Sequence, residues 1–219
     1  MNIQNIITDL FSNKSPLFFE IGANDGTDTV WLSQIAKIVH AFEPDDEVFS
    51  KLALVKFQNQ VILNHCAIGK EVGTVQFYKS SGIWPAQPVV SPLGDRSANY
   101  CWDKSGSIKK PKEHLITHPW CKFDSMLQVR VETLDNYCAQ NHIDRIDFVW
   151  ADVQGAEADM ISGGKDTFSK RVKYLYTEYA DNEQYEGQLT LSKTKEALPG
   201  YKVIQDFGGN ALFFNEHIQ

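Results

Sequence analysis

The chain is short of positive charge, has no paired-cysteine motif and contains no long apolar run. It carries 21 Lys and Arg against 28 Asp and Glu, a net charge of −7. This balance argues against a general affinity for nucleic acid or anionic membranes, so we expect neither as a partner. No apolar stretch approaches the roughly 20 residues that span a bilayer, and the N-terminus lacks a signal-peptide pattern. We therefore expect a cytoplasmic protein.

The four cysteines, Cys66, Cys101, Cys121 and Cys138, form no C-x-x-C pair. We interpret them as free thiols of a reducing compartment. A Cys101–Cys121 disulfide is conceivable, but nothing in the sequence supports it.

The sequence also gives little indication of a metal site. His114, His118 and Cys121 have a spacing that imitates metal ligands, but no fourth ligand is evident and Pro119 interrupts any shared helix. We expect no zinc site.

Buried apolar segments alternate with amphipathic ones along most of the chain. The former predict strands at 17–21, 38–42, 61–63, 146–150 and 172–177, with helices between them. This alternation is typical of an α/β fold whose doubly wound, mostly parallel sheet is covered on both faces. A C-terminal hairpin around Gly208 and Gly209 would add one antiparallel strand. At 219 residues we expect a single domain, 1–219.

The stretch 80–128 breaks this pattern. It has no clean periodicity, yet it holds Trp84, Trp102, Trp120 and five prolines. Long loops in compact domains are often lids or binding loops, so we interpret it as a substrate-covering insertion. The alternative is a partly helical insertion that packs its tryptophans. Its basic residues hint at an acidic, ring-bearing substrate: Arg96, Lys104, Lys109, Lys110 and Lys112.

Residues 20–26 read EIGANDG and join the first buried strand to a helix that begins near Thr27. Gly22 permits a tight turn, and Gly26 lets the helix approach a ligand. The N–H groups of the helix N-terminus can hold a carboxylate, and Glu20 can accept a hydrogen bond from an ammonium group. Together these features suit the methionine end of S-adenosylmethionine. A generic strand–turn–helix is the alternative.

The next two strand ends extend this cofactor site. Glu43, followed by Pro44, stands just over 20 residues after Glu20, where doubly wound domains bind ribose hydroxyls. Residues 64–67 read NHCA at the tip of the third strand, which places Cys66 and Ala67 beside the adenine ring. They could equally be packed side chains.

A nicotinamide dinucleotide is the rival ligand. Its G-x-G-x-x-G fingerprint keeps bare backbone beneath the pyrophosphate, but Asn24 replaces the second glycine here. A side chain at this position would crowd a diphosphate but could contact an amino acid. Asn24 is thus the main reason to favour methyl transfer over hydride transfer.

Acidic residues follow two further strands. Asp152 ends a buried strand and opens the segment DVQGAE, whose last residue is Glu157, and Glu178 ends the next strand. Carboxylates that converge at one edge of a sheet need a cation or shared protons. A sulfonium cofactor would supply positive charge, and so would a divalent metal that bridges Asp152 and Glu178. Glu157 and Glu178 could also be a first-turn helix acid and a surface residue.

These motifs resemble the FkbM family of S-adenosylmethionine-dependent methyltransferases. The resemblance rests on EIGANDG at 20–26, AFEP at 41–44, VETLD at 131–135 and DVQGAE at 152–157, in that order. It implies a class I methyltransferase fold, Rossmann-like, and O-methylation of sugars or other hydroxylated metabolites. It also implies that Gly22, Asn24 and Gly26 belong to the cofactor loop, that Glu43 binds the ribose and that Asp152 lies beside the transferred methyl group. Two departures are Glu20, where Asp is commoner, and the long segment 80–128.

We therefore predict an enzyme that methylates a hydroxyl group of a small molecule, with a sugar as the candidate substrate. A hydroxyl must lose its proton as the new bond forms. Asp152 is the first candidate for the base, with Glu178 and Glu157 behind it. The rival hypotheses are a nicotinamide-dependent oxidoreductase and a non-catalytic module that binds the cofactor.

Overall fold

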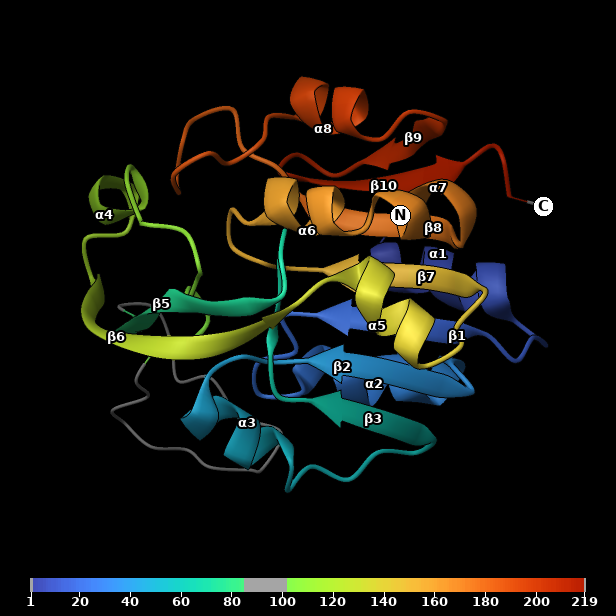
Figure 1. Cartoon of the computed structure of the whole chain (residues 1–219), viewed down its shortest axis with the longest axis horizontal. Helices are drawn as coiled ribbons and strands as arrows, with labels where there is room; N and C mark the ends of the chain where they lie inside the picture. Colours follow the sequence, from blue (N-terminus) through green and yellow to red (C-terminus); the bar gives the residue numbers. More distant parts are fainter. Residues whose placement is uncertain (1, 85–101, 219) are drawn as a thin grey trace.

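A seven-stranded sheet forms the centre of the molecule (Figure 1). The computed structural model describes residues 2–84 and 102–218. The strand order is β3-β2-β1-β7-β8-β10-β9, and β10 alone runs antiparallel to the other six. The strands are β1 (Leu17–Ile21), β2 (Ile38–Phe42), β3 (Gln60–Asn64), β7 (Ile146–Ala151), β8 (Val172–Glu178), β9 (Tyr201–Asp206) and β10 (Asn210–Asn215). The prediction of a mostly parallel sheet with one antiparallel strand from a C-terminal hairpin is confirmed.

Helices cover both faces of this sheet. Alternation along β1 sends Phe18 into one apolar layer and Phe19 into the other. The Phe18 layer packs against α1 (Ile3–Phe11), α2 (Thr27–Ile35) and α3 (Asp46–Leu52). The Phe19 layer packs against α5 (Leu134–Gln140), α6 (Glu157–Gly163), α7 (Lys165–Lys170) and α8 (Leu191–Ala197). Among the described residues, no helix has the length and apolar character needed to cross a membrane.

Polar caps fix where several helices begin. Asp45 Oδ1 accepts hydrogen bonds from the N–H groups of Glu47 and Val48 at the start of α3. Thr133 caps α5 in the same way through the N–H of Asn136. Helix α3 starts just beyond β2, so its cap also fixes the loop at the carboxyl end of that strand.

A second, three-stranded sheet lies beyond the carboxyl ends of the main strands (Figure 1). It consists of β4 (Ala67–Ile68), β6 (Cys121–Glu132) and β5 (Gly73–Gly82), and α4 (His114–Thr117) precedes β6. Strand β6 therefore starts within the stretch for which the sequence indicates no element. Most of the β6 side chains are at least partly exposed and the β5–β6 register shifts between Lys79 and Ser81, which hides the usual alternation.

Candidate active site

The loop after β1 is held in one conformation by close backbone contacts. The N–H groups of Gly22 and Ala23 both donate to the carbonyl of Phe42, at 3.0 and 2.9 Å. Gly22 has a φ of +91°, and a Cβ there would lie 1.9 Å from the carbonyl oxygen of Asp152. Any other residue would push β1 and β7 apart at their carboxyl ends. Glycine at position 22 therefore permits the close approach of β1 and β7 as well as the predicted turn.

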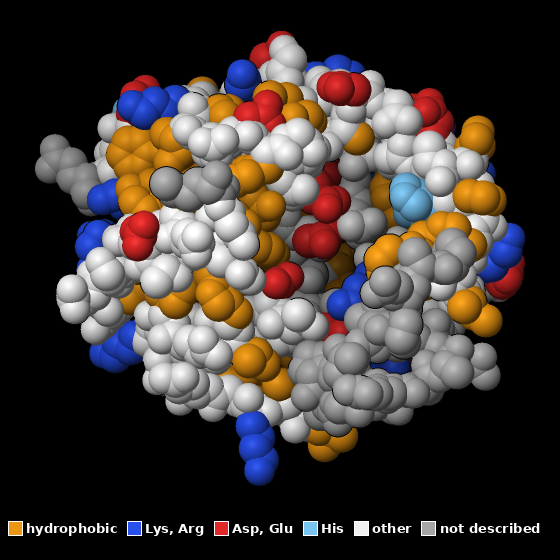
Figure 2. Space-filling view, turned by 180° about the vertical axis from the view of Figure 1, so that it is seen from behind, with side chains coloured by type: hydrophobic (Ala, Val, Ile, Leu, Met, Phe, Trp, Pro, Cys, Tyr) orange, Lys and Arg blue, Asp and Glu red, His pale blue; other side chains and the backbone are white. Residues whose placement is uncertain are grey.

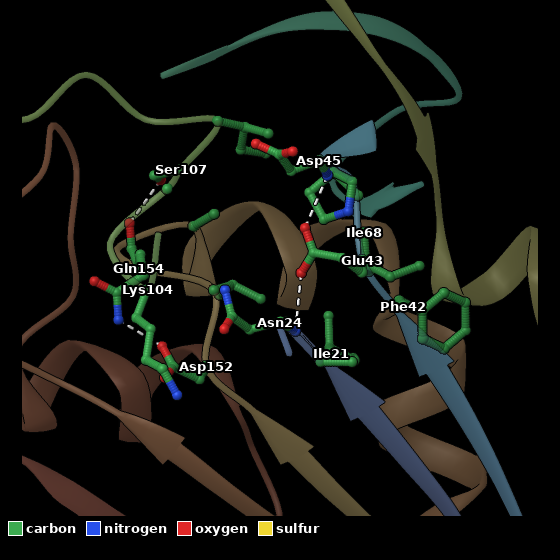
Figure 3. Close-up of a pocket in the computed structure, with 18 of the residues that line it drawn as sticks. Ile21, Asn24, Phe42, Glu43, Asp45, Ile68, Lys104, Ser107, Asp152 and Gln154 are labelled. Carbon is green, nitrogen blue, oxygen red and sulfur yellow. Dashed lines mark hydrogen bonds between the residues drawn. The ribbon is translucent and has the colours of Figure 1, made fainter. Parts of the chain in front are cut away.

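Glu43 at the end of β2 ties this loop to α3. Its Oε2 accepts from the N–H of Asn24 (2.9 Å) and its Oε1 from the N–H of Asp45 (2.8 Å; Figure 3). Asn24 adopts a left-handed conformation (φ 45°), which asparagine tolerates better than most residues. Burial raises the pKa of Glu43 to about 8, although both N–H groups favour the charged form. The carboxylate is thus pre-positioned and still lines a cavity.

This cavity, the donor cavity, runs along the carboxyl ends of β1, β2 and β7 (Figure 3). The predicted cofactor residues that line it are Gly22, Asn24, Thr27, Glu43, Pro44, Cys66, Ala67 and Asp152. Its far end is apolar, with Ile68, Phe77 and Ile108 on the wall. The structure therefore brings together residues from four separate motifs of the sequence.

Acidic side chains and a single lysine occupy the other end of the donor cavity. Asp25, Asp28 and Asp152 line it, and the Lys104 ammonium lies 3.1 Å from Asp25 Oδ2. Burial raises the pKa of Asp28, with the nearby Lys104 acting in the opposite direction. Burial also acts to raise the pKa of Asp25, but Lys104 and Thr27 bring it below its ordinary value. Among the described lining residues Lys104 is the only Lys or Arg, so this end attracts cations.

Hydrogen bonds at this end define what the loop still offers to a ligand. Asp25 Oδ1 accepts from the N–H and the hydroxyl of Thr27, at 3.1 and 2.7 Å, so this helix N–H is already satisfied. The amide nitrogen of Asn24 donates to the carbonyl of Asp103 (3.0 Å), while its Oδ1 is buried without a hydrogen-bond partner. Asn24 Oδ1 can therefore accept a hydrogen bond from a ligand ammonium group. The N–H of Thr27 is less suited to a ligand carboxylate, because it already donates to Asp25.

Gln154 joins the two carboxylates that the sequence places at neighbouring strand ends. Its Nε2 donates to Asp152 Oδ1 (2.6 Å) and Glu178 Oε2 (3.3 Å). Burial raises the pKa of Asp152. The charge of Asp152, followed by burial, raises the pKa of Glu178 well above its ordinary value. We name this arrangement the Asp152–Gln154–Glu178 clasp.

A second cavity lies on the other side of the clasp, and we name it the tryptophan cavity. Asp152, Gln154 and Lys104 line it together with Glu178, while Trp84, Trp102 and Trp120 form part of its wall. Asp152 therefore borders both cavities. Figure 2 shows a hollow on this side of the molecule, with acidic side chains inside it and hydrophobic side chains and a histidine along its rim.

Three predicted residues do not reach the cavity walls. Glu20 is buried on the side of β1 that faces α2, beside Thr29, because strand alternation turns it away from Ile21. Its pKa is raised mainly by burial. Glu157 is buried in the first turn of α6, where Oε1 accepts from the N–H of Gly155 (3.4 Å), and burial raises its pKa to about 7. Gly26 caps α2 with a φ of +81° and packs against Leu52.

The structure also places the histidines and cysteines that the sequence offered as cofactor contacts, metal ligands or disulfide partners. His65 lies on the surface, 2.9 Å from Asp46, and not beside the donor cavity. His114 and His118 stack with ring centroids 4.5 Å apart, and burial lowers the pKa of His114 to about 4. Among residues 2–84 and 102–218, no three His, Cys, Asp or Glu side chains are arranged to hold a metal ion. Cys101, one partner of the conceivable disulfide, lies outside the described residues.

Three residues that line the cavities were not predicted to belong to the cofactor site. Asp28 lies in the first turn of α2, two residues after Gly26, and none of the recognised motifs includes it. Lys104 comes from the segment 80–128, whose fold no periodicity revealed. Gln154 lies inside a recognised motif, but its left-handed backbone (φ 49°) and its bonds to both carboxylates have no signature in a single sequence.

The sheet order and the acid-lined cavity at its switch point define a class I methyltransferase. The chain belongs to the FkbM methyltransferase family, because the model of the methyltransferase FkbM domain matches residues 20–213. The 2-O-methyltransferase NoeI of Sinorhizobium fredii (strain NBRC 101917 / NGR234) is 33% identical over 210 residues, which cover 94% of this chain and 81% of that protein.

Solved structures support the same fold. Methyltransferase FkbM from Methylobacillus flagellatus KT has a TM-score of 0.52 at 16% identity, over 91% of this chain and 43% of that one. The present chain therefore spans less than half of that protein. Magnesium protoporphyrin IX methyltransferase (ChlM) from Synechocystis PCC 6803, solved with bound S-adenosylmethionine, has a TM-score of 0.50 at 10% identity, over 96% of this chain and 74% of that one.

The donor cavity fits the cofactor of this family. S-adenosylmethionine carries a sulfonium and an ammonium group, and the cavity offers acidic side chains and the unpaired Asn24 Oδ1. Glu43 adds a carboxylate to the cavity wall, and the end around Phe77 is apolar. The predictions of family, fold, methyl transfer and S-adenosylmethionine as cofactor are confirmed. The oxidoreductase alternative is not supported.

Proposed function

We propose that this chain methylates a hydroxyl group of a neutral sugar, with Asp152 as the general base. The observation that carries the proposal is the position of Asp152, which lines both the donor cavity and the tryptophan cavity. A base must lie between donor and acceptor to take the proton of the attacking hydroxyl. The name of the relative NoeI, a 2-O-methyltransferase, supports oxygen as the acceptor atom.

The cofactor contacts follow from the cavity walls. Glu43 would accept hydrogen bonds from the ribose hydroxyls, and Cys66 and Ala67 would flank the adenine ring. Asp28 and Asn24 would hold the ammonium group. Lys104 would pair with the carboxylate, as the one Lys or Arg among the described lining residues.

The bound cofactor supplies a methyl group on positively charged sulfur. The acceptor oxygen would form a bond to the methyl carbon as the carbon–sulfur bond breaks. The electron pair of the broken bond would stay on sulfur. The hydroxyl proton passes to the carboxylate of Asp152. Because burial raises the pKa of this carboxylate, it is a stronger base than an exposed aspartate. Gln154 orients Asp152 and keeps Glu178 beside it.

A neutral acceptor fits the site better than the acidic one suggested by the basic residues of segment 80–128. Lys104, Lys109 and Lys112 form ion pairs with Asp25, Asp159 and Glu183 of the same chain. The clasp between the cavities is acidic and would repel an anion. Arg96 lies outside the described residues.

Labelled S-adenosylmethionine tests the proposal. Mass spectrometry of metabolite extracts incubated with the protein should find label on a sugar hydroxyl, and Asp152→Asn should abolish it while S-adenosylhomocysteine still binds in calorimetry. Label on nitrogen or on a phenol would contradict the proposal. A protein that binds S-adenosylhomocysteine but transfers no label would instead support the non-catalytic module.

We also propose a cytoplasmic location and a substrate-covering role for segment 80–128. The buried thiols of Cys66 and Cys138 suit a reducing compartment. Cell fractionation with an antibody tests the location, and recovery of the protein in a secreted fraction would contradict it.

A further inference from the structure

The tryptophan cavity has the size of a small-molecule site. Its volume is about 520 Å³, inside the roughly 300–1,000 Å³ typical of ligand pockets. It adjoins the donor cavity through Lys104, Asp152 and Gln154, which line both. A molecule bound here would therefore lie next to the proposed base.

Three tryptophan rings form one wall of this cavity. Ring centroids are 5.2 Å apart for Trp84 and Trp102, and 5.1 Å apart for the perpendicular pair Trp102 and Trp120. The rings are not a closed core, because none of the three residues is fully buried and Trp84 keeps 39% of its surface exposed. Each of the three tryptophans therefore keeps part of its surface accessible.

The backbone is built to keep these rings together. Gly82, at the end of β5, has a φ of +102°, and a Cβ there would lie 2.1 Å from the carbonyl oxygen of Trp120. The Gly82 carbonyl accepts from the N–H of Trp102 (2.8 Å). Trp102 Nε1 donates to Ser105 Oγ (2.8 Å), which fixes its ring in turn. These hydrogen bonds hold Trp102 and Trp120 in place before any ligand binds, and both residues line the cavity.

The rest of the lining is polar and acidic. Asp152 and Glu178 project from the strand ends, with the Gln154 amide between them. A pyranose ring matches both kinds of surface, since the C–H groups on one face of the ring are apolar and its rim carries hydroxyls. Aromatic rings gain dispersion energy from such a face, and carboxylates accept from hydroxyls.

We propose that Trp120 and Trp102 form the acceptor platform on which a neutral pyranose ring stacks, with one of its hydroxyls directed to Asp152. This inference rests on the proposed function and deepens it, because it names the residues that select the acceptor. A flat phenol would also stack, but its acidic hydroxyl does not need a buried base. A sugar acid would bring a second negative charge to the clasp.

Binding of neutral methyl pyranosides tests the platform directly. Saturation-transfer NMR with the methyl glycosides of glucose, galactose and mannose, each in the presence of S-adenosylhomocysteine, should show at least one binder, with transfer to its ring C–H protons. Glucuronate should bind at least tenfold more weakly than methyl glucoside or not at all. For the glycoside that binds, Trp120→Leu should raise the dissociation constant about tenfold, the loss of one stacked ring, and Trp120→Phe should recover most of it.

Three controls separate this platform from a structural effect. Ser105→Ala removes the hydrogen bond to Trp102 but keeps the ring, so it should change binding less than Trp102→Leu. Trp31→Leu removes a tryptophan that packs on Trp150 and lines neither cavity, so it should leave glycoside binding unchanged. Affinity for S-adenosylhomocysteine should stay within twofold in every variant.

Unaltered glycoside affinity in Trp120→Leu, or no binding of any neutral glycoside to the wild-type protein, would overturn the inference. Neither outcome touches the proposed function, which is decided by label on a sugar hydroxyl. Loss of S-adenosylhomocysteine binding by Trp120→Leu would also overturn the inference, because it would show that the ring supports the fold of the donor cavity.

Discussion

Asp152→Asn should slow methyl transfer and at the same time stabilise the protein. Asparagine keeps the shape of aspartate but cannot take a proton. General bases contribute about 10²–10⁴-fold to such rates, so kcat should fall by that factor. The dissociation constant of S-adenosylhomocysteine should change far less, because Glu43 and the loop at Gly22 hold the adenosine part.

The gain in stability follows from the effect of Asp152 on Glu178. The Asp152 charge is the main cause of the raised pKa of Glu178. A carboxyl whose pKa is higher in the folded than in the unfolded state lowers stability as pH rises above its unfolded pKa. Removing the Asp152 charge lowers the pKa of Glu178, and each unit of that change is worth about 1.4 kcal/mol. We expect the free energy of unfolding to rise by about 1–3 kcal/mol near pH 8, with the gain vanishing near pH 4.

Urea unfolding followed by tryptophan fluorescence across this pH range measures the gain, and transfer from labelled cofactor measures kcat. Glu178→Gln should give a similar gain in stability with a smaller loss of rate. Asp144→Asn, at an exposed position, is the matched control and should change neither quantity. An Asp152→Asn protein that is less stable than wild type near pH 8 would refute the repulsion argument. One that retains more than a tenth of kcat would refute the assignment of the base.

Further predictions concern the cofactor loop and the buried acids. Glu43→Ala leaves the N–H groups of Asn24 and Asp45 without their acceptor and removes the ribose contact, so calorimetry should show about 10–100-fold weaker binding of S-adenosylhomocysteine; unchanged affinity would rule out the ribose role. Gly22→Ala forces a Cβ onto the Asp152 carbonyl and should cost at least about 2 kcal/mol of stability, whereas Gly187→Ala, also left-handed (φ +77°) but in open space, should cost less; equal losses would leave only backbone strain as the cause. Because the pKa of Glu157 is raised to about 7, stability should fall as pH rises from about 5 to about 8, and Glu157→Gln should flatten that slope; an unaltered slope would show that Glu157 does not titrate there.

Much of the site could be predicted from the sequence, because the residues at which buried strands end could be predicted. Glu43, Asp152 and Glu178 each follow a buried apolar run, and the carboxyl ends of parallel strands meet at one edge, so their convergence follows from topology. Topology does not determine the direction in which a side chain points at such a strand end. Glu20 has the same sequence context as Glu43, yet its side chain turns toward α2 and away from the donor cavity.

The part of the site formed by segment 80–128 could not be predicted from the sequence, for a different reason. Most side chains of β6 are at least partly exposed, and its pairing with β5 contains a register shift, so β6 shows no continuous buried face in the sequence. The path that brings Lys104 to Asp25, and Trp102 to Trp120, depends on contacts between residues far apart in the chain, such as the bond from Ser107 Oγ to the Gln154 carbonyl (2.7 Å). A single sequence carries no signal for such contacts.

The excess of acid in the donor cavity has a consequence for how the two forms of the cofactor bind. S-adenosylmethionine and S-adenosylhomocysteine share the adenosine, the ammonium group and the carboxylate, and they differ in one methyl group and one positive charge on sulfur. Burial raises the pKa of Glu43 to about 8, so this carboxyl is largely protonated near neutral pH. A cation in the donor cavity favours the ionised form of Glu43, so binding of the sulfonium promotes proton release more than binding of the neutral product does.

The affinity for S-adenosylmethionine should therefore increase more steeply between about pH 6 and about pH 8 than that for S-adenosylhomocysteine, by up to tenfold for each proton released per pH unit. Calorimetry in two buffers of different ionisation enthalpy measures the proton count for each ligand. Glu43→Gln should bring the two slopes together, because it removes the carboxyl whose pKa of about 8 lies at the end of this range. Parallel slopes in the wild-type protein would mean that the sulfonium charge does not act on Glu43, and this account of the donor cavity would then be wrong.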